Sequence, residues 1–270
     1  MTSATVAWLA FCTLSNPAGG VPVRVTPAYR DLTAYLSVPP FLEDRLIYYN
    51  AFEQTGGKPE IDRTGDVQSG QIVTGPGGVR GRCAVAQEGQ ALQLSSDAFS
   101  PHRPLSVAFW WQLGRDEQLD STFDLFHLTN GKGFVSHFSR GKGEWCALER
   151  PAAVLQVYYL SDIANLNGIY DSDLMAHLDL RAGVWHHTAL VFNGGSLIEV
   201  YSDGRQVWAT RLNGRPFSAS DKLHDLTIGS RYGVPMALDE VLILGRALTA
   251  DEISTYVTAV RQMREVGYPL

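Results

Sequence analysis

The chain has 270 residues, of which 45% are hydrophobic and 19% are charged, and its formal net charge at pH 7 is −6. This composition excludes a disordered chain and fits one large domain with an extension, or two small domains. The negative charge argues against binding to a phosphate backbone, so we expect no nucleic-acid partner. The three cysteines, Cys12, Cys83 and Cys146, leave at least one thiol unpaired, which argues against a disulfide framework.

Residues 1–44 differ from the rest of the chain. Ala4 to Leu14 is an apolar run too short to span a bilayer as a helix. No Lys or Arg precedes it and no Ala-x-Ala site follows it, so we interpret it as a strand, with an atypical secretory signal as the alternative. Thr26 and Pro27 favour the start of a short helix that ends before Pro39. Because the segment is too apolar for a solvated tail, we predict an arm that docks onto the rest of the chain or onto another protein subunit.

From Leu46 onward, short alternating segments predict β-strands. The expected strands are residues 46–52, 90–94, 105–113, 123–128 and 154–160, with further strands beginning near Trp185, Ile198, Gln206, Leu226 and Leu238. In residues 105–113, alternation places Val107, Phe109, Trp111 and Leu113 on one face. The strand number favours a sandwich or barrel, and the absence of an internal repeat argues against a propeller or solenoid.

Turn and cap residues fix the end of the pattern. Asn193-Gly-Gly195 and Asp203-Gly204 tolerate positive φ and predict two successive hairpins. Thr249 and Glu252 form a capping box, so a helix is expected to follow. Its predicted apolar face consists of Ile253, Tyr256, Val257, Val260 and Met263.

The motifs, taken in order, resemble one family. They are Tyr49 to Glu53, Asp62 to Gly65, Gly77 to Arg82, Val107 to Trp111, Trp185-His186-His187, Asp203-Gly204, Leu226 to Gly229, Asp239-Glu240 and Arg246 to Leu248. This series resembles the laminin-G-like, concanavalin A-type lectin family over residues 45–260. The resemblance implies an all-β, antiparallel jelly-roll β-sandwich at residues 45–270 with a closing C-terminal helix. The extended arm at residues 1–44 has no counterpart in it.

Strand alternation argues against a catalytic or metal role for the paired polar residues. Trp185 and His187 share one face and His186 takes the other, so the two histidines do not chelate one metal. Asp239 and Glu240 are likewise expected on opposite faces, whereas a glycosidase needs two carboxyls that converge at about 5 to 9 Å. Arg246 is expected to form an ion pair with these acids. No nucleophile elbow, P-loop, HExxH or EF-hand motif is present, and we predict no catalytic residue.

The resemblance also implies ligands. Proteins of this kind often hold a structural calcium ion at the rim of the sandwich, where Glu53, Asp62 and Asp239 stand in this chain. Aromatic residues in loops stack on sugar rings, and Trp145, Tyr170 and Tyr232 are the candidates for a cell-surface glycan. No transmembrane segment is expected.

Three functions remain in view. The first is a non-catalytic structural and adhesion module of a larger assembly, such as a phage virion, docked through residues 1–44. The second is a secreted glycan-binding module at the extracellular surface. The third is a glycoside hydrolase of the same fold, although the E-x-D-x-x-E motif of the glucanases that this fold resembles is missing.

Overall fold

The computed structural model divides the chain into two units, Met1–Ser37 and Val38–Leu270. It describes residues 42, 44–54, 59–62, 66–69, 73–87, 90–95, 103–114, 126–129, 134–140, 153–159, 181–195, 197–211, 225–229 and 235–265, all in the second unit. The predicted strand at residues 4–14, the helix that begins near Thr26 and the docking arm as a surface therefore lie outside the described residues.

The second unit is built from antiparallel strands and closes with a helix, α3. The strands are β1 (Leu46–Asn50), β2 (Ile61–Asp62), β3 (Asp66–Ser69), β4 (Val73–Pro76), β5 (Arg82–Ala86), β6 (Leu92–Ser95), β7 (Pro104–Leu113), β8 (Phe126–Thr129), β9 (Phe134–Arg140), β10 (Ala153–Tyr159), β11 (His186–Asn193), β12 (Leu197–Ser202), β13 (Arg205–Arg211), β14 (Asp225–Ile228) and β15 (Met236–Leu244), and α3 is Ala250–Glu265.

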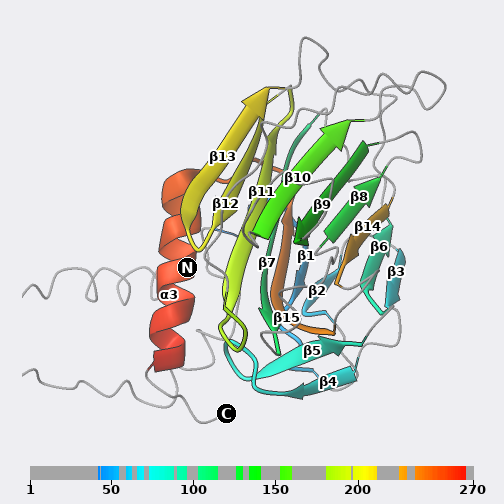
Figure 1. The fold of residues 1–270 in the computed structure, drawn as a ribbon, viewed down its shortest axis with the longest axis vertical. Coiled ribbons are helices and arrows are strands. Elements are labelled where there is room, and N and C mark those ends of the chain that lie inside the picture. The colour runs from blue at the N-terminus through cyan, green and yellow to red at the C-terminus, as the bar shows by residue number, and fades with distance from the viewer. Residues whose placement is uncertain are drawn as a thin grey trace, which may run out of the picture. The chain divides into compact units, whose positions relative to one another are not determined.

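Two main sheets form the sandwich. The larger has nine strands in the order β13-β12-β11-β7-β15-β1-β2, with β5 beside β15 and β4 beside β5 (Figure 1). The smaller has the order β3-β6-β14-β8, and β9 and β10 form a further antiparallel pair next to β8. All the strand pairings among the described residues are antiparallel, which confirms the predicted all-β jelly-roll class.

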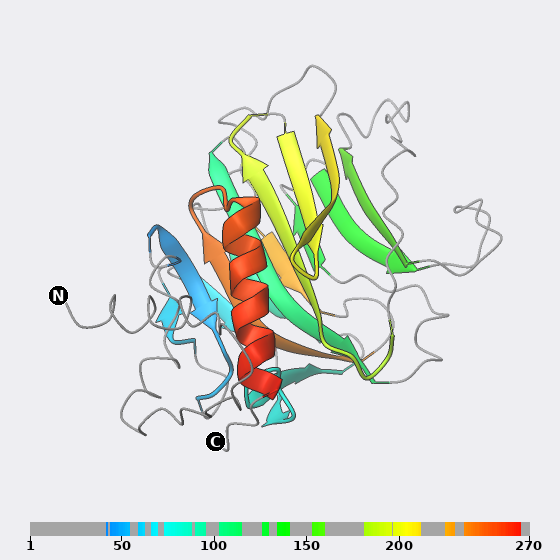
Figure 2. The same cartoon turned by 90° about the vertical axis from the view of Figure 1, so that its left-hand side faces the viewer.

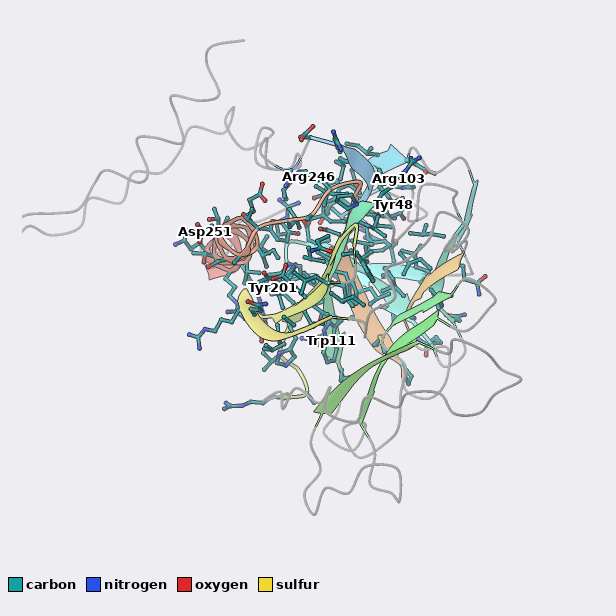
Figure 3. All side chains as sticks on the ribbon, turned by 90° about the horizontal axis from the view of Figure 1, so that it is seen from above. Tyr48, Arg103, Trp111, Tyr201, Arg246 and Asp251 are labelled. Atoms are coloured by element: carbon teal, nitrogen blue, oxygen red, sulfur yellow. The ribbon has the colours of Figure 1, made fainter. Side chains whose placement is uncertain are left out.

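The central strands of the nine-stranded sheet, β7, β11 and β15, are buried on both faces. One face packs against the smaller sheet, and this inter-sheet core contains Val107, Phe109, Trp111 and Leu113 of β7, as alternation predicts. The opposite face carries a second core, which includes Ala108 and Trp110 of β7 together with side chains of α3. Figure 3 shows Tyr201 near the helix and Trp111 farther from it.

Helix α3 lies across the outer face of the nine-stranded sheet (Figure 2). Its predicted capping box is present, because Thr249 N donates to Glu252 Oε2 at 2.8 Å and Glu252 N donates to Thr249 Oγ1 at 3.2 Å. Ile253, Tyr256, Val257 and Val260 form its buried face, as predicted, while the side chain of Met263 lies outside the described residues. Arg246 pairs with Glu252 at 2.8 Å, so its predicted ion pair with Asp239 or Glu240 is wrong.

Both predicted hairpins are confirmed. Asp203 and Gly204 join β12 to β13 with φ values of +52° and +84°, which is why a residue pair tolerant of positive φ is needed there. Gly194, with φ of +80°, lies in the connection between β11 and β12. The first of these turns is important for α3, because an added Cβ at Gly204 would lie 3.3 Å from Val257 Cβ.

Candidate functional site

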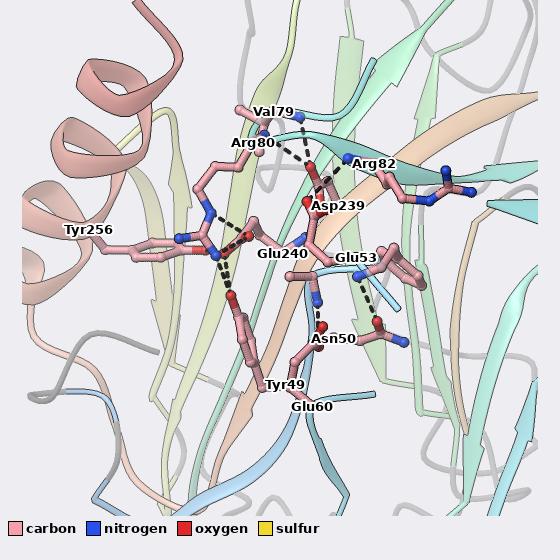
Figure 4. Close-up of polar contacts among 12 residues, drawn as sticks. Tyr49, Asn50, Glu53, Glu60, Val79, Arg80, Arg82, Asp239, Glu240 and Tyr256 are labelled. Carbon is pink, nitrogen blue, oxygen red and sulfur yellow. Dashed lines mark hydrogen bonds and ion pairs between the residues drawn. The ribbon is translucent and has the colours of Figure 1, made fainter. Parts of the chain in front are cut away.

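A bulge in β15 brings together two acids that alternation would separate. Glu240 has φ of +51°, and the register between β15 and β7 shifts between Asp239 and Leu242. A bulge inserts an unpaired residue and redirects the side chains around it. The prediction that the two carboxyls face opposite sides of the strand is therefore wrong, since both carboxyls contact the segment Val79–Arg80 (Figure 4).

Asp239 holds this segment through backbone amides. Its Oδ2 accepts hydrogen bonds from Val79 N at 2.7 Å and Arg80 N at 3.4 Å, and its Oδ1 accepts one from Glu240 N at 2.8 Å. The side chain is fully buried. Burial and the nearby charge of Glu240 raise the pKa of Asp239 well above its usual range, although the amide donors oppose this shift. Asp239 thus acts as a structural acceptor inside the fold.

Glu240 is the centre of a second buried network. Its Oε1 accepts from Arg80 Nε at 2.7 Å, and Arg80 Nη2 lies 2.6 Å from the same oxygen. Its Oε2 accepts from the hydroxyls of Tyr49 at 3.0 Å and Tyr256 at 3.1 Å. We call Tyr49, Arg80, Glu240 and Tyr256 the buried tetrad. The tetrad links four parts of the fold at one carboxylate: β1, α3, β15 and the segment that precedes β5. The role of Glu240 in the described structure is therefore structural.

Two further acids support the same region. Glu53 Oε1 accepts from Arg82 N at 3.1 Å, and Glu60 Oε2 accepts from Ala51 N at 2.8 Å. Burial raises the pKa of both glutamates. Their bonds to backbone amides fix the end of β1 and the start of β5.

The predicted calcium ligands are not assembled by the described residues. Asp239 is buried with N–H donors on both oxygens, Glu53 is half-buried on a backbone amide, and Asp62 is exposed on β2. Within the described ranges, no group of three or more His, Cys, Asp or Glu side chains is placed to hold a metal ion. Calcium binding stays a prediction, tested by comparing the Tm in millimolar CaCl2 with that in EDTA. A calcium-dependent rise that Asp62→Asn abolishes would support the site, and equal Tm values would remove it.

The two histidines occupy opposite faces of β11, as predicted. His186 lies 5.4 Å from the Trp111 ring on the side of the inter-sheet core, and its Nδ1 is 3.1 Å from Asp203 Oδ2. The His187 ring contacts Trp110 at 5.3 Å and Tyr256 at 5.6 Å on the side of α3. These contacts exclude a shared metal and make both rings part of the packing.

Asp203 joins the histidine pair to the helix. It accepts from His187 N at 3.0 Å and from Arg261 Nη2 at 2.7 Å, in addition to its contact with His186. Burial opposes ionisation, but these donors outweigh it and lower the pKa of Asp203. Its side chain therefore couples the β12–β13 turn to β11 and α3.

The predicted sugar-stacking residues Trp145, Tyr170 and Tyr232 lie outside the described residues. In the part of the chain that the structure describes, the exposed large hydrophobic side chains are Val73 and Val184, and neither is aromatic. Among the residues whose side chains the structure describes, every aromatic ring is buried, so none of these rings is available for stacking on a sugar.

These features define an antiparallel β-sandwich of the lectin type whose conspicuous acids stabilise the scaffold. The chain belongs to the concanavalin A-like lectin/glucanases superfamily, whose family model matches residues 86–254. This confirms the resemblance that the sequence motifs indicate. The comparison with curated proteins finds no match.

Solved structures show the same fold at low sequence identity. Domain 4 of AbnA, a GH43 extracellular arabinanase from Geobacillus stearothermophilus in complex with arabinotriose, matches with a TM-score of 0.56 and 17% identity, over 79% of this chain and 98% of that one. The binding domain of Paraclostridial Mosquitocidal Protein 1 gives 0.55 and 15%, over 80% and 52%. The binding domain of botulinum neurotoxin serotype D gives 0.53 and 10%, over 81% and 51%.

The chain spans about half the length of the toxin binding domains that it matches, and nearly all of the arabinanase domain. At these identities the likeness shows the fold alone. Among the described helices, none has the length and apolar character needed to cross a membrane.

Proposed function

We propose that this chain is a non-catalytic, glycan-binding β-sandwich that serves as an adhesion module. The observation that carries the proposal is that Asp239 and Glu240, in a lectin-type fold, are buried and fully engaged in hydrogen bonds within the protein. Their side chains are 0% and 1% exposed, and their oxygens accept hydrogen bonds from backbone amides, Arg80 and two tyrosine hydroxyls. A glycosidase needs carboxyls that reach the scissile bond, and these two do not reach solvent.

The comparisons support a binding role. The solved structures of this fold include an arabinanase domain with bound arabinotriose and the binding domains of two toxins. Fold likeness alone does not assign a ligand, so the glycan has to be identified on this chain itself.

A panel of immobilised oligosaccharides that includes arabinotriose tests the proposal. We expect saturable retention of the full chain on at least one glycan, blocked by the same glycan in solution. Substituting Trp145, Tyr170 or Tyr232 by Ala is expected to weaken this retention about tenfold, or about 1.4 kcal/mol, for whichever ring stacks on the sugar. Val73→Ala, at an exposed non-aromatic position on β4, is the matched control. Retention no greater than that of an unrelated protein on every glycan would refute the proposal.

Assembly through residues 1–44 is a separate proposal. This proposal is supported by the apolar sequence of the arm. Under it, the chain would be part of a virion or of an assembly on an extracellular surface. Size-exclusion chromatography of the full chain and of residues 45–270 tests it. We expect a larger species for the full chain alone, whereas monomers from both would confine the arm to its own chain.

A further inference from the structure

His187 is a buried titratable group at the boundary between α3 and the nine-stranded sheet. Its side chain is 0% exposed, and neither ring nitrogen has a hydrogen-bond partner among the described residues. The ring is enclosed by Trp110 of β7 and Tyr256 of α3, with centroids at 5.3 Å and 5.6 Å. Protonation would place a second N–H donor and a full charge in an apolar contact, which buried sites tolerate poorly.

The charged side chains around His187 form their hydrogen bonds and ion pairs with other groups and not with the His187 ring. Asp203, in the β12–β13 turn, accepts from His186 Nδ1, from the His187 backbone N–H and from Arg261 of α3. Arg261 also lies 5.7 Å from the centre of the Trp110 ring. On the other side, the Tyr256 hydroxyl donates to Glu240, which pairs with Arg80.

These surroundings keep the imidazole neutral. Burial and, to a smaller extent, the charge of Arg261 lower the pKa of His187 to about 3, although Asp203 acts in the opposite direction.

The packing of α3 is separate from the core at the centre of the sandwich. The inter-sheet core contains no residue of α3, whereas the outer core takes Ile253, Tyr256, Val257 and Val260 from it. The polar links of α3 to the rest of the fold include Arg246–Glu252 at its start, Tyr256–Glu240 at its middle and Arg261–Asp203 near its end. A local opening of this element therefore removes one layer of packing and leaves the other.

We propose that α3 is an acid-sensitive cover, which undocks from the nine-stranded sheet when His187 is protonated and exposes the apolar face beneath it. In the docked state the histidine resists the proton, and in the undocked state it is open to water and titrates at its ordinary pKa of about 6.5.

The direction and size of the pH effect on α3 docking follow from the difference between the pKa of His187 in the docked and undocked states. The folded pKa lies below the open-state pKa, so the docked state has its full stability above about pH 6.5 and loses it as the pH falls toward 3. Over that window each pH unit raises the ratio of undocked to docked helix about tenfold, to about 3,000-fold in total. The fold lowers the pKa of Glu252 from its ordinary 4.5 and that of Asp203 from its ordinary 3.8, so both carboxylates remain charged and favour docking at about pH 5. Of these three groups, His187 is therefore the one whose protonation weakens docking between about pH 7 and about pH 5.

Hydrogen exchange measured by mass spectrometry on the full chain tests the proposal, after correction for the intrinsic effect of pH on exchange. Between about pH 7 and about pH 5, we expect the opening constant of α3 to rise about 25-fold, while that of β7 changes less than threefold. His187→Phe keeps an aromatic ring against Trp110 and Tyr256 and is expected to remove the pH dependence of α3 opening. His186→Gln, on the opposite face of β11, is the matched control and is expected to retain it.

Three results would overturn the proposal: equal opening of α3 and β7 at about pH 5, unchanged α3 protection, or an unaltered pH response in His187→Phe. If that variant does not fold, an NMR titration of the His187 ring in the unsubstituted chain replaces it. We expect its apparent protonation to coincide with loss of α3 protection, and protonation while α3 stays protected would contradict the mechanism.

Discussion

Substituting Arg80 tests whether the buried tetrad holds the fold together. Arg80→Met removes the guanidinium that lies 2.6 Å from Glu240 and keeps a side chain able to fill part of its space. Glu240 is then left 1% exposed with the hydroxyls of Tyr49 and Tyr256 as its side-chain donors. Breaking a buried ion pair by removing one partner costs about 3–5 kcal/mol. For a domain of this size that corresponds to a fall in Tm of about 10 °C.

The assay is urea unfolding of four proteins: the unsubstituted chain, Arg80→Met, Glu240→Gln and the double variant. Because the double variant leaves no uncompensated buried charge, we expect it to recover about half of the loss seen in Arg80→Met. Arg205→Met, at an exposed position on β13, is the matched control and is expected to change the free energy of unfolding by less than about 0.5 kcal/mol. If Arg80→Met costs no more than Arg205→Met, the structural role of the tetrad is refuted.

Three further substitutions probe the scaffold around the tetrad and α3. Gly78→Ala places a Cβ 2.2 Å from Arg82 O, whereas the nearest neighbour of the Cβ in Gly75→Ala is Val85 Cγ2 at 3.8 Å. Thermal unfolding should therefore show that Gly78→Ala loses about 1–3 kcal/mol of unfolding free energy relative to Gly75→Ala. Thr249→Ala removes the N-cap of α3 and is expected to cost about 1 kcal/mol in urea unfolding; no change would show that the capping box is dispensable. Asp203→Asn is expected to cost about 1–2 kcal/mol near pH 7. Because the pKa of Asp203 is lowered on folding, its contribution is present above its ordinary 3.8 and is lost as the pH falls below it, so the two chains should converge near pH 2; a pH-independent difference would contradict this.

Periodicity was sufficient for the elements whose burial follows one simple pattern. β7 alternates between two cores, and its inter-sheet face is the one that its sequence predicts. The start of α3 follows from Thr249 and Glu252, because a capping box depends only on residues close in sequence. The sequence does not predict β4, since Gly75 and Pro76 are poor strand residues. It does not predict β9 either, because Phe134 and Ser136 fall on the same face and break the alternation of apolar and polar residues.

The site was less predictable because its geometry is set by contacts between distant segments. Glu240 adopts positive φ without being Gly, Asn or Asp, so nothing in the sequence signals the bulge that redirects Asp239 and Glu240. Arg80, the partner of Glu240, lies 160 residues away in the chain, and the sequence identifies it only as part of a glycine-rich motif. Its position between Val79 and Gly81, in a stretch that otherwise suits a turn, was the available signal. The opposite faces of His186 and His187 needed strand alternation alone and were predicted correctly.

The central claim is that this sandwich binds a glycan without cleaving it. Isothermal titration of the full chain with the oligosaccharide that it retains best, followed by detection of new reducing ends in the same sample, tests both parts together. We predict a saturable heat of binding and no increase in reducing ends over a day. Release of shorter sugars above the rate in buffer, or the absence of saturable binding to any glycan, would contradict the account.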